Sequence, residues 1–127
     1  MKVASQTPDY LPEAGYFYRM ARADRFVIAD DIVMSSSGMV NRCRIHRPDG
    51  VQILTVPILR KGKGPQLIRD VRIDTSRHWR KKHWRSLYLN YRYAPYFDYY
   101  ADFFQKVYDR EWRFLVDLNL EMLHHLR

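Results

Sequence analysis

Residues 8–17 carry two prolines, one glycine and three aromatic side chains, so the backbone of this segment can follow only a few paths. A short apolar run follows at residues 25–29 and ends on two adjacent carboxylates, Asp30 and Asp31. An Asn41-Arg42 pair comes ten residues after Asp31. Carboxylates at the end of a strand, beside a rigid loop, occupy the position in which α/β proteins place ligand sites. We therefore expect this N-terminal part of the chain to hold a binding site.

The same part predicts a parallel pair of strands. Residues 2–5 can form a first strand, residues 15–23 a short helix and residues 25–29 a second strand. Two strands joined through a helix form a parallel pair with a right-handed crossover. The unbroken run Phe26-Val27-Ile28 is typical of a strand buried on both faces.

A β-hairpin is expected next. Residues 41–46 and 51–58 flank Arg47-Pro48-Asp49-Gly50, whose turn residues predict an antiparallel connection. The serine-rich residues 35–38 predict a loop. Residues 67–73 alternate between apolar and polar side chains and predict a further strand. The expected sheet is therefore small and mixed, with the Pro-rich loop after its first strand.

The hydrophobic period becomes helical after residue 74. Residues 74–76 offer an N-cap, and Ala94-Pro95 ends the first helix. The side chains expected on the apolar faces are Trp79, His83, Leu87 and Tyr91 in a first helix, Phe97, Tyr100, Phe104 and Tyr108 in a second, and Trp112, Leu115, Val116, Asn119, Met122, Leu123 and Leu126 in a third. Because the third stripe has no Gly or Pro stop, we expect a second copy of the chain, another partner or further C-terminal sequence to cover it.

These patterns predict one α/β domain over residues 1–127, with a sheet part at about 1–74 and a C-terminal helical part at about 75–127. The lone Cys43 cannot form an internal disulfide, which favours a reducing compartment and a cytoplasmic location. No segment approaches the roughly 20 apolar residues of a membrane span, and the N-terminus lacks the apolar run of a signal peptide.

Positive charge is concentrated in the middle of the chain. Residues 32–97 hold 14 Lys and Arg against Asp49, Asp70 and Asp74, a net charge of +11, whereas the remaining residues carry −3 of the total of +8. Such a segment favours an anion: a nucleic acid, a phosphate-bearing metabolite or an acidic membrane surface. The simpler alternative is a solvated basic face on an ordinary domain.

Two pairs of polar residues in the N-terminal part could bind a ligand. Adjacent strand residues point to opposite faces, so only one of Asp30 and Asp31 can serve a given site, by binding a hydroxyl or amine or by accepting a proton. Alternatively, both are carboxylates at the start of a loop. Arg42 supplies a planar fork for phosphate and Asn41 both a donor and an acceptor, although together they could simply begin a surface strand.

A third candidate is His83, one helical turn after Trp79 and surrounded by Arg80, Lys81, Lys82 and Arg85. A histidine in this setting can be a general base or a phosphate ligand, although a core histidine is commoner. No second His, Cys or carboxylate lies at metal-ligand spacing, so no metal site is predicted. The sequence also contains no phosphate-cradling glycine motif and no nucleophile elbow.

Six short motifs occur in the order in which they occur in the WbqC-like family, which this chain resembles. The matches lie between about residues 3 and 115. The corresponding family motifs are Q-P-N-Y-L-P-W-x-G-Y-F, A-D-x-F-V-x-L-D-D, N-R-N-x-I, L-T-V-P, W-x-K-K-H and Y-x-x-A-P-Y-F. The matching residues are Pro8, Tyr10, Leu11, Pro12, Gly15, Tyr16 and Phe17; Ala23, Asp24, Phe26, Val27, Asp30 and Asp31; Asn41, Arg42 and Ile45; Leu54 to Pro57; Trp79, Lys81, Lys82 and His83; and Tyr91 with Ala94 to Phe97.

The resemblance implies a transferase associated with O-antigen and other cell-surface polysaccharides, which moves an acyl or amino-acyl group onto an activated amino sugar. It implies no particular cofactor. The ligand is then a phosphorylated or nucleotide-linked sugar, with Arg42 holding phosphate, Asp31 binding a sugar hydroxyl or amine, and His83 acting as the base. The other residues expected to contact the substrate are Tyr10, Tyr16, Asn41 and Trp79.

This chain also departs from the family pattern. Gln6 and Thr7 replace a His-Gln pair, Glu13 replaces a tryptophan, and family members continue well past residue 127. A second hypothesis is therefore a non-catalytic binding or scaffold protein derived from that family. A third is a nucleic-acid-binding module, which rests on the +11 segment alone, and we expect no sequence-specific nucleic acid partner.

Overall fold

The computed structural model describes residues 1–35, 38–95 and 97–126. Its elements are β1 (Val3–Gln6), α1 (Ala14–Arg22), β2 (Arg25–Ile28), β3 (Arg42–Arg47), β4 (Gly50–Thr55), the short 3₁₀ helix η1 (Ile68–Asp70), α2 (Arg80–Tyr91), α3 (Phe97–Asp109) and α4 (Leu115–Leu126). The predicted α/β class with a helical C-terminal part is confirmed. The middle of the predicted serine-rich loop and one residue of the Ala94–Phe97 motif lie outside the described residues.

The strands form two separate two-stranded sheets rather than one. β1 and β2 pair in parallel through α1, and β3 and β4 form the antiparallel hairpin, as predicted. The prediction that β2 is buried on both faces is wrong, because Phe26 and Ile28 are only half-buried and Val27 is 44% exposed. The face of the β1–β2 sheet that carries Phe26 packs on α1, where the ring centroids of Tyr16 and Phe26 are 5.6 Å apart.

Residues 67–73 do not form the predicted strand. They fold into η1, flanked by three isolated bridges that pair Leu67 with Val33, Ile73 with Ile58 and Arg72 with Phe114. Ile68, Val71 and Ile73 are buried, so the apolar pattern is satisfied by a tight turn instead of an extended strand. The predicted N-cap at residues 74–76 is also wrong: α2 begins at Arg80.

The residues before α2 form a turn of their own. The Asp74 carboxylate accepts hydrogen bonds from the backbone N–H of Ser76, at 3.1 Å, and from its hydroxyl, at 2.6 Å. An Asp and a Ser in this arrangement stabilise a local turn, which competes with helix initiation.

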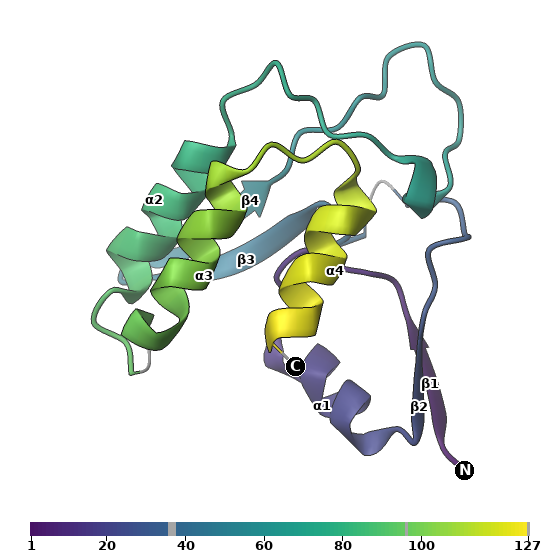
Figure 1. Cartoon of the computed structure of the whole chain (residues 1–127), viewed down its shortest axis with the longest axis horizontal. Coiled ribbons are helices and arrows are strands. Elements are labelled where there is room, and N and C mark those ends of the chain that lie inside the picture. The colour runs from purple at the N-terminus through teal and green to yellow at the C-terminus, as the bar shows by residue number, and fades with distance from the viewer. Residues whose placement is uncertain (36–37, 96, 127) are drawn as a thin grey trace.

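The core lies where the hairpin, the helices and the long connection between β4 and α2 meet. α2 packs against both α3 and β3, and α4 lies between the α2–α3 pair and the unit formed by β1, α1 and β2 (Figure 1). The apolar stripe on α4 is covered by the chain itself, since its members Leu115, Met122 and Leu123 are all buried. The stripe therefore does not by itself require a partner.

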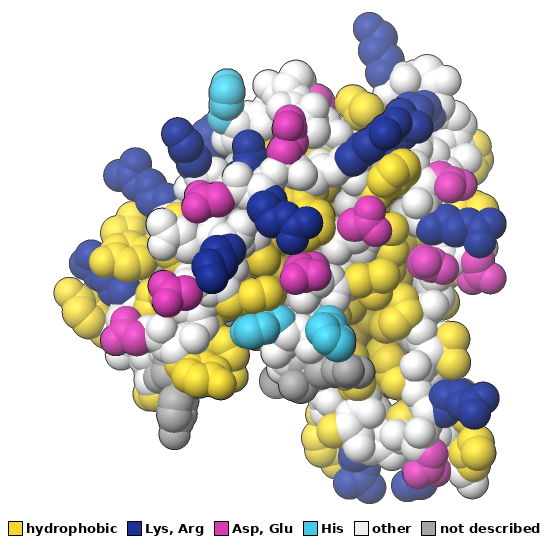
Figure 2. Space-filling view, in the orientation of Figure 1, with side chains coloured by type: hydrophobic (Ala, Val, Ile, Leu, Met, Phe, Trp, Pro, Cys, Tyr) yellow, Lys and Arg dark blue, Asp and Glu magenta, His cyan; other side chains and the backbone are white. Residues whose placement is uncertain are grey.

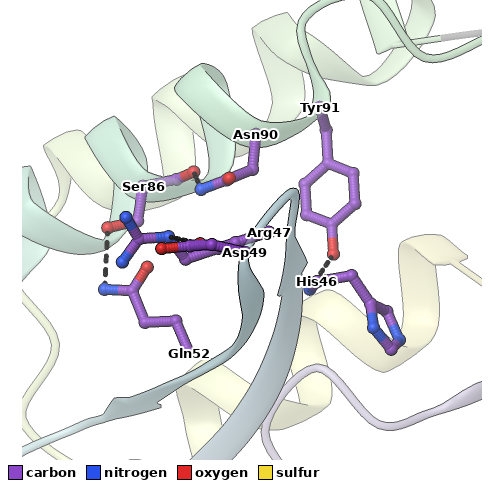
Figure 3. A network of polar contacts seen from close by, with 7 residues as sticks. All are labelled: His46, Arg47, Asp49, Gln52, Ser86, Asn90 and Tyr91. Carbon is purple, nitrogen blue, oxygen red and sulfur yellow. Dashed lines mark hydrogen bonds and ion pairs between the residues drawn. The ribbon is translucent and has the colours of Figure 1, made fainter.

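Polar contacts fix the hairpin against α2 (Figure 3). The backbone N–H of His46 donates to the Tyr91 hydroxyl at 3.0 Å, and the Gln52 amide donates to the Ser86 hydroxyl at 3.5 Å. The Asn90 amide donates to the Ser86 carbonyl at 2.8 Å, within α2. These contacts place the outer edge of β3 beside the C-terminal end of α2.

Candidate functional site

A polar pocket lies between the Pro-rich loop, α1 and the start of β3. Its volume is about 190 Å³. Charged and aromatic side chains line it, among them Asp9, Glu13, Tyr16, Arg19, Arg42 and Arg44. We call it the arginine pocket, because guanidinium groups reach it from both α1 and β3. Arg42 and Arg44 alternate along one strand and so share a face, and Arg19 follows Tyr16 by nearly one helical turn.

Hydrogen bonds hold the loop in place as one wall of this pocket. The Tyr10 N–H donates to the Met39 carbonyl at 3.2 Å, and the Tyr16 hydroxyl donates to the Thr7 carbonyl at 2.7 Å. Between them Leu11 adopts a φ of 42°, a left-handed conformation that is costly for a residue with a bulky side chain. Strain of this kind concentrates at functional sites, where the surrounding structure holds it in place.

Three guanidinium groups and two carboxylates line the pocket, a formal charge of 3 − 2 = +1 that favours an anion. Burial raises the pKa of Asp9 above its usual value, although the Thr7 hydroxyl, which donates to its carboxylate at 2.6 Å, and the charge of Arg19 act in the opposite direction. Burial also raises the pKa of Tyr16 to about 12, so this hydroxyl stays protonated. Glu13 forms an ion pair with Arg44 at 3.7 Å, but both side chains are more than half exposed and the pair is weakly held.

The structure brings three predicted substrate-binding residues, Tyr10, Tyr16 and Arg42, to the arginine pocket. Asn41, next to Arg42, is 2% exposed and extends the hairpin instead: its amide donates to the Val56 carbonyl at 3.1 Å. Its Oδ1 atom has no hydrogen-bond partner among the described residues. Asn41 therefore positions Arg42 through the backbone.

His83 lies in the core, in a chain of hydrogen bonds. Its Nδ1 accepts from the Tyr10 hydroxyl at 2.7 Å, its Nε2–H donates to the Thr55 carbonyl at 3.1 Å, and the Tyr108 hydroxyl bonds to that of Tyr10. Burial lowers the pKa of His83 from 6.5 to about 4. The imidazole is therefore neutral at pH 7 with both nitrogens occupied, an environment that argues against the predicted role of general base.

Trp79 supports this core histidine. Its ring meets that of His83 edge-on, with the centroids 5.1 Å apart, and it is buried. Trp79 also lines a separate cavity of about 510 Å³ with Arg80, Lys81 and Tyr108. It does not line the arginine pocket.

Asp31 is exposed after the end of β2 and does not line the arginine pocket. The backbone there is fixed by a hydrogen bond of 2.9 Å from the Arg69 N–H to the Asp30 carbonyl. We expect Asp31→Asn to change the free energy of unfolding by less than about 1 kcal/mol, as exposed substitutions usually do. Urea denaturation measures this, and a loss of several kcal/mol would assign Asp31 a structural role.

Asp9, Arg19 and Arg44 are not among the site residues predicted from the sequence. Local signals for two of them exist: Arg44 is two strand residues after Arg42, and Arg19 is three helical residues after Tyr16. In the described residues no three His, Cys, Asp or Glu side chains are placed to hold a metal ion together. None of the described helices has the length and hydrophobicity needed to cross a bilayer.

Comparisons with known proteins agree on the relationship of this chain. The model of the WbqC-like protein family matches residues 7–127. The chain is 40% identical over 110 residues to the uncharacterized protein Rv1507c of Mycobacterium tuberculosis. The match covers 87% of this chain and 47% of the relative, so the chain spans about half the length of that protein. No solved structure matches.

Proposed function

Because this chain belongs to the WbqC-like protein family, we propose that it binds a phosphorylated or nucleotide-linked sugar in the arginine pocket, as part of a transferase of cell-surface polysaccharide synthesis. The observation that carries this proposal is the convergence of Arg19, Arg42 and Arg44 on one small pocket walled by a strained loop. Guanidinium forks bind phosphate oxygens in pairs, so three of them can hold a phosphate or diphosphate.

Asp9 is the best-placed proton acceptor for this chemistry. In acyl transfer to an amino sugar, the amine nitrogen attacks the acyl carbonyl and loses a proton as the leaving group departs. Asp9 lines the pocket and is half-buried, and desolvation raises its pKa. Its carboxylate can also accept a hydrogen bond from a sugar hydroxyl or amine, the role predicted above for Asp31.

Truncating the pocket arginines should weaken binding of a sugar phosphate. We expect Arg42→Ala and Arg19→Ala each to raise the Kd for glucose 1-phosphate roughly 10- to 100-fold, because hydrogen bonds to charged groups contribute about 1.5–3 kcal/mol. Isothermal titration calorimetry measures the Kd.

The matched control is Arg22→Ala. Arg22 lies one turn after Arg19 on α1, is exposed and does not line the pocket, so its removal should leave the Kd unchanged. Equal losses in Arg19→Ala and Arg22→Ala would indicate a general charge effect and would argue against this pocket.

The salt dependence of binding distinguishes this proposal from nucleic acid binding. Lys and Arg are interspersed with Asp and Glu on the face shown in Figure 2, rather than joined into one basic surface. A sugar phosphate makes one or two phosphate contacts, so its affinity should fall only slightly with salt. Single-stranded DNA would lose affinity with a slope of about −0.7 per contact. Lys81→Glu with Lys82→Glu should abolish DNA binding and leave the sugar phosphate bound.

A further inference from the structure

A second and larger cavity adjoins the arginine pocket. Its volume is about 730 Å³, and the two share the wall formed by Leu11, Pro12, Glu13, Cys43 and Arg44. Its other walls come from α2, α3 and the connection between them, and they are rich in rings: Tyr91, Phe97, Tyr100 and Phe104. We call it the aromatic cavity.

The outer edge of β3 adds polar groups to this cavity. Along an antiparallel hairpin, backbone groups point alternately toward the partner strand and away from it. The His46 N–H points away from β4, since it donates to the Tyr91 hydroxyl (Figure 3). Arg44 precedes His46 by two residues, so its N–H and C=O also point away from β4. Both residues line the cavity, and within the described chain β3 has no strand partner other than β4.

We propose that the aromatic cavity holds the base of a nucleotide-linked sugar whose phosphates lie in the arginine pocket. This inference rests on the proposed function and narrows its ligand from any phosphorylated sugar to a nucleotide-linked one. Bases stack on aromatic side chains, and their polar edges require a donor and an acceptor of the kind that the Arg44 backbone presents. An acyl chain would make no use of those polar groups.

The sizes of the two cavities agree with this division of the ligand. A volume of about 730 Å³ lies within the range of about 300–1,000 Å³ typical of ligand cavities, whereas 190 Å³ lies below it. Arg44 lines both cavities, and its ion pair with Glu13 is exposed and weak, so its guanidinium is available to a diphosphate at the boundary.

Calorimetric titration with UDP-glucose, GDP-mannose, dTDP-glucose and glucose 1-phosphate tests the inference. At least one nucleotide sugar should bind more tightly than glucose 1-phosphate. Tyr100→Leu should raise the Kd for that nucleotide sugar roughly 5- to 100-fold, because stacking contributes about 1–3 kcal/mol per base. The Kd for glucose 1-phosphate should stay unchanged.

Tyr93→Leu is the matched control. Tyr93 lies in the connection between α2 and α3, is 87% exposed and does not line the cavity, so this variant should bind as the parent chain does. A second variant, Ala94→Trp, fills the cavity from an exposed position without removing a core side chain. It should weaken binding of the nucleotide sugar in the same way. Circular dichroism confirms that each variant is folded.

Three results would overturn the inference, and they differ in what they say of the proposed function. If glucose 1-phosphate binds as tightly as every nucleotide sugar and Tyr100→Leu and Ala94→Trp change nothing, the base lies elsewhere while the proposed function stands. If neither class of ligand binds, the proposed function fails as well. If dodecyl phosphate binds more tightly than any nucleotide sugar and loses affinity in Tyr100→Leu, the cavity holds an acyl chain.

Discussion

Lowering the pH from 7 to 4 is expected to remove about 3 kcal/mol of folding free energy through His83 alone. Burial lowers the pKa of this imidazole from 6.5 to about 4 in the folded protein. Between these values the unfolded chain binds a proton that the folded chain does not, so protons favour unfolding. The stabilisation is complete above about pH 6.5 and falls steadily as the pH approaches 4.

Urea denaturation at a series of pH values between 7 and 4 measures this loss. His83→Gln keeps an amide near the Thr55 carbonyl but cannot take up a proton. Between pH 7 and pH 4 this variant should therefore lose about 3 kcal/mol less unfolding free energy than the parent chain. His78→Gln, at an exposed position, should retain the full dependence of the parent chain. A His83 pKa above 6, measured by NMR in the folded protein, would contradict the prediction, even if His83→Gln were too unstable to study.

Replacing Asn119 by alanine should destabilise the fold by about 3 kcal/mol. The side chain is fully buried in α4, and its amide donates to the Pro8 carbonyl at 2.7 Å and to the Val40 carbonyl at 2.8 Å. Asn119→Ala would leave two buried carbonyls without donors, and each such group costs about 1–3 kcal/mol. Thermal or urea unfolding gives the value.

Asn90→Ala provides the comparison. Its amide donates to one carbonyl only, that of Ser86 one turn earlier in α2, and Asn90 is half-buried rather than fully buried. Its loss should cost less than about 1 kcal/mol. If Asn119→Ala and Asn90→Ala had similar effects, Asn119 would not be the link between α4 and the loop that the structure indicates.

The elements with local signals could be predicted from sequence, and those without could not. The hairpin follows from Pro48-Asp49-Gly50 between two β-prone runs, and the parallel pair from two short runs around a helix. Residues 67–73 alternate like a strand, but they have only isolated bridging partners and therefore turn. Alternation records which side chains are buried, and both a strand and a tight turn can bury them.

The residues of the candidate site likewise divide into those with a local sequence signal and those without one. Tyr10, Tyr16 and Arg42 belong to short motifs and do line the arginine pocket. The hydrogen bonds of His83 involve Tyr10, 73 residues away, and the Thr55 carbonyl, 28 residues away. The residues around position 83 indicate neither contact. Asn119 lies in an apolar stripe where its spacing predicts burial, but only the tertiary structure shows which carbonyls its amide reaches.

The contacts that fix the Pro-rich loop also dictate when the arginine pocket can form. The loop is held by Asn119, 111 residues from Pro8, and by Tyr108, 98 residues from Tyr10. Contacts between residues so far apart in sequence form late in folding, because the entropy cost of closing the long intervening loop opposes them. The hairpin pairs residues that are close in sequence, but the wall of the pocket cannot be secured until α4 has been made. A nascent chain halted before residue 119 should therefore lack a formed binding site.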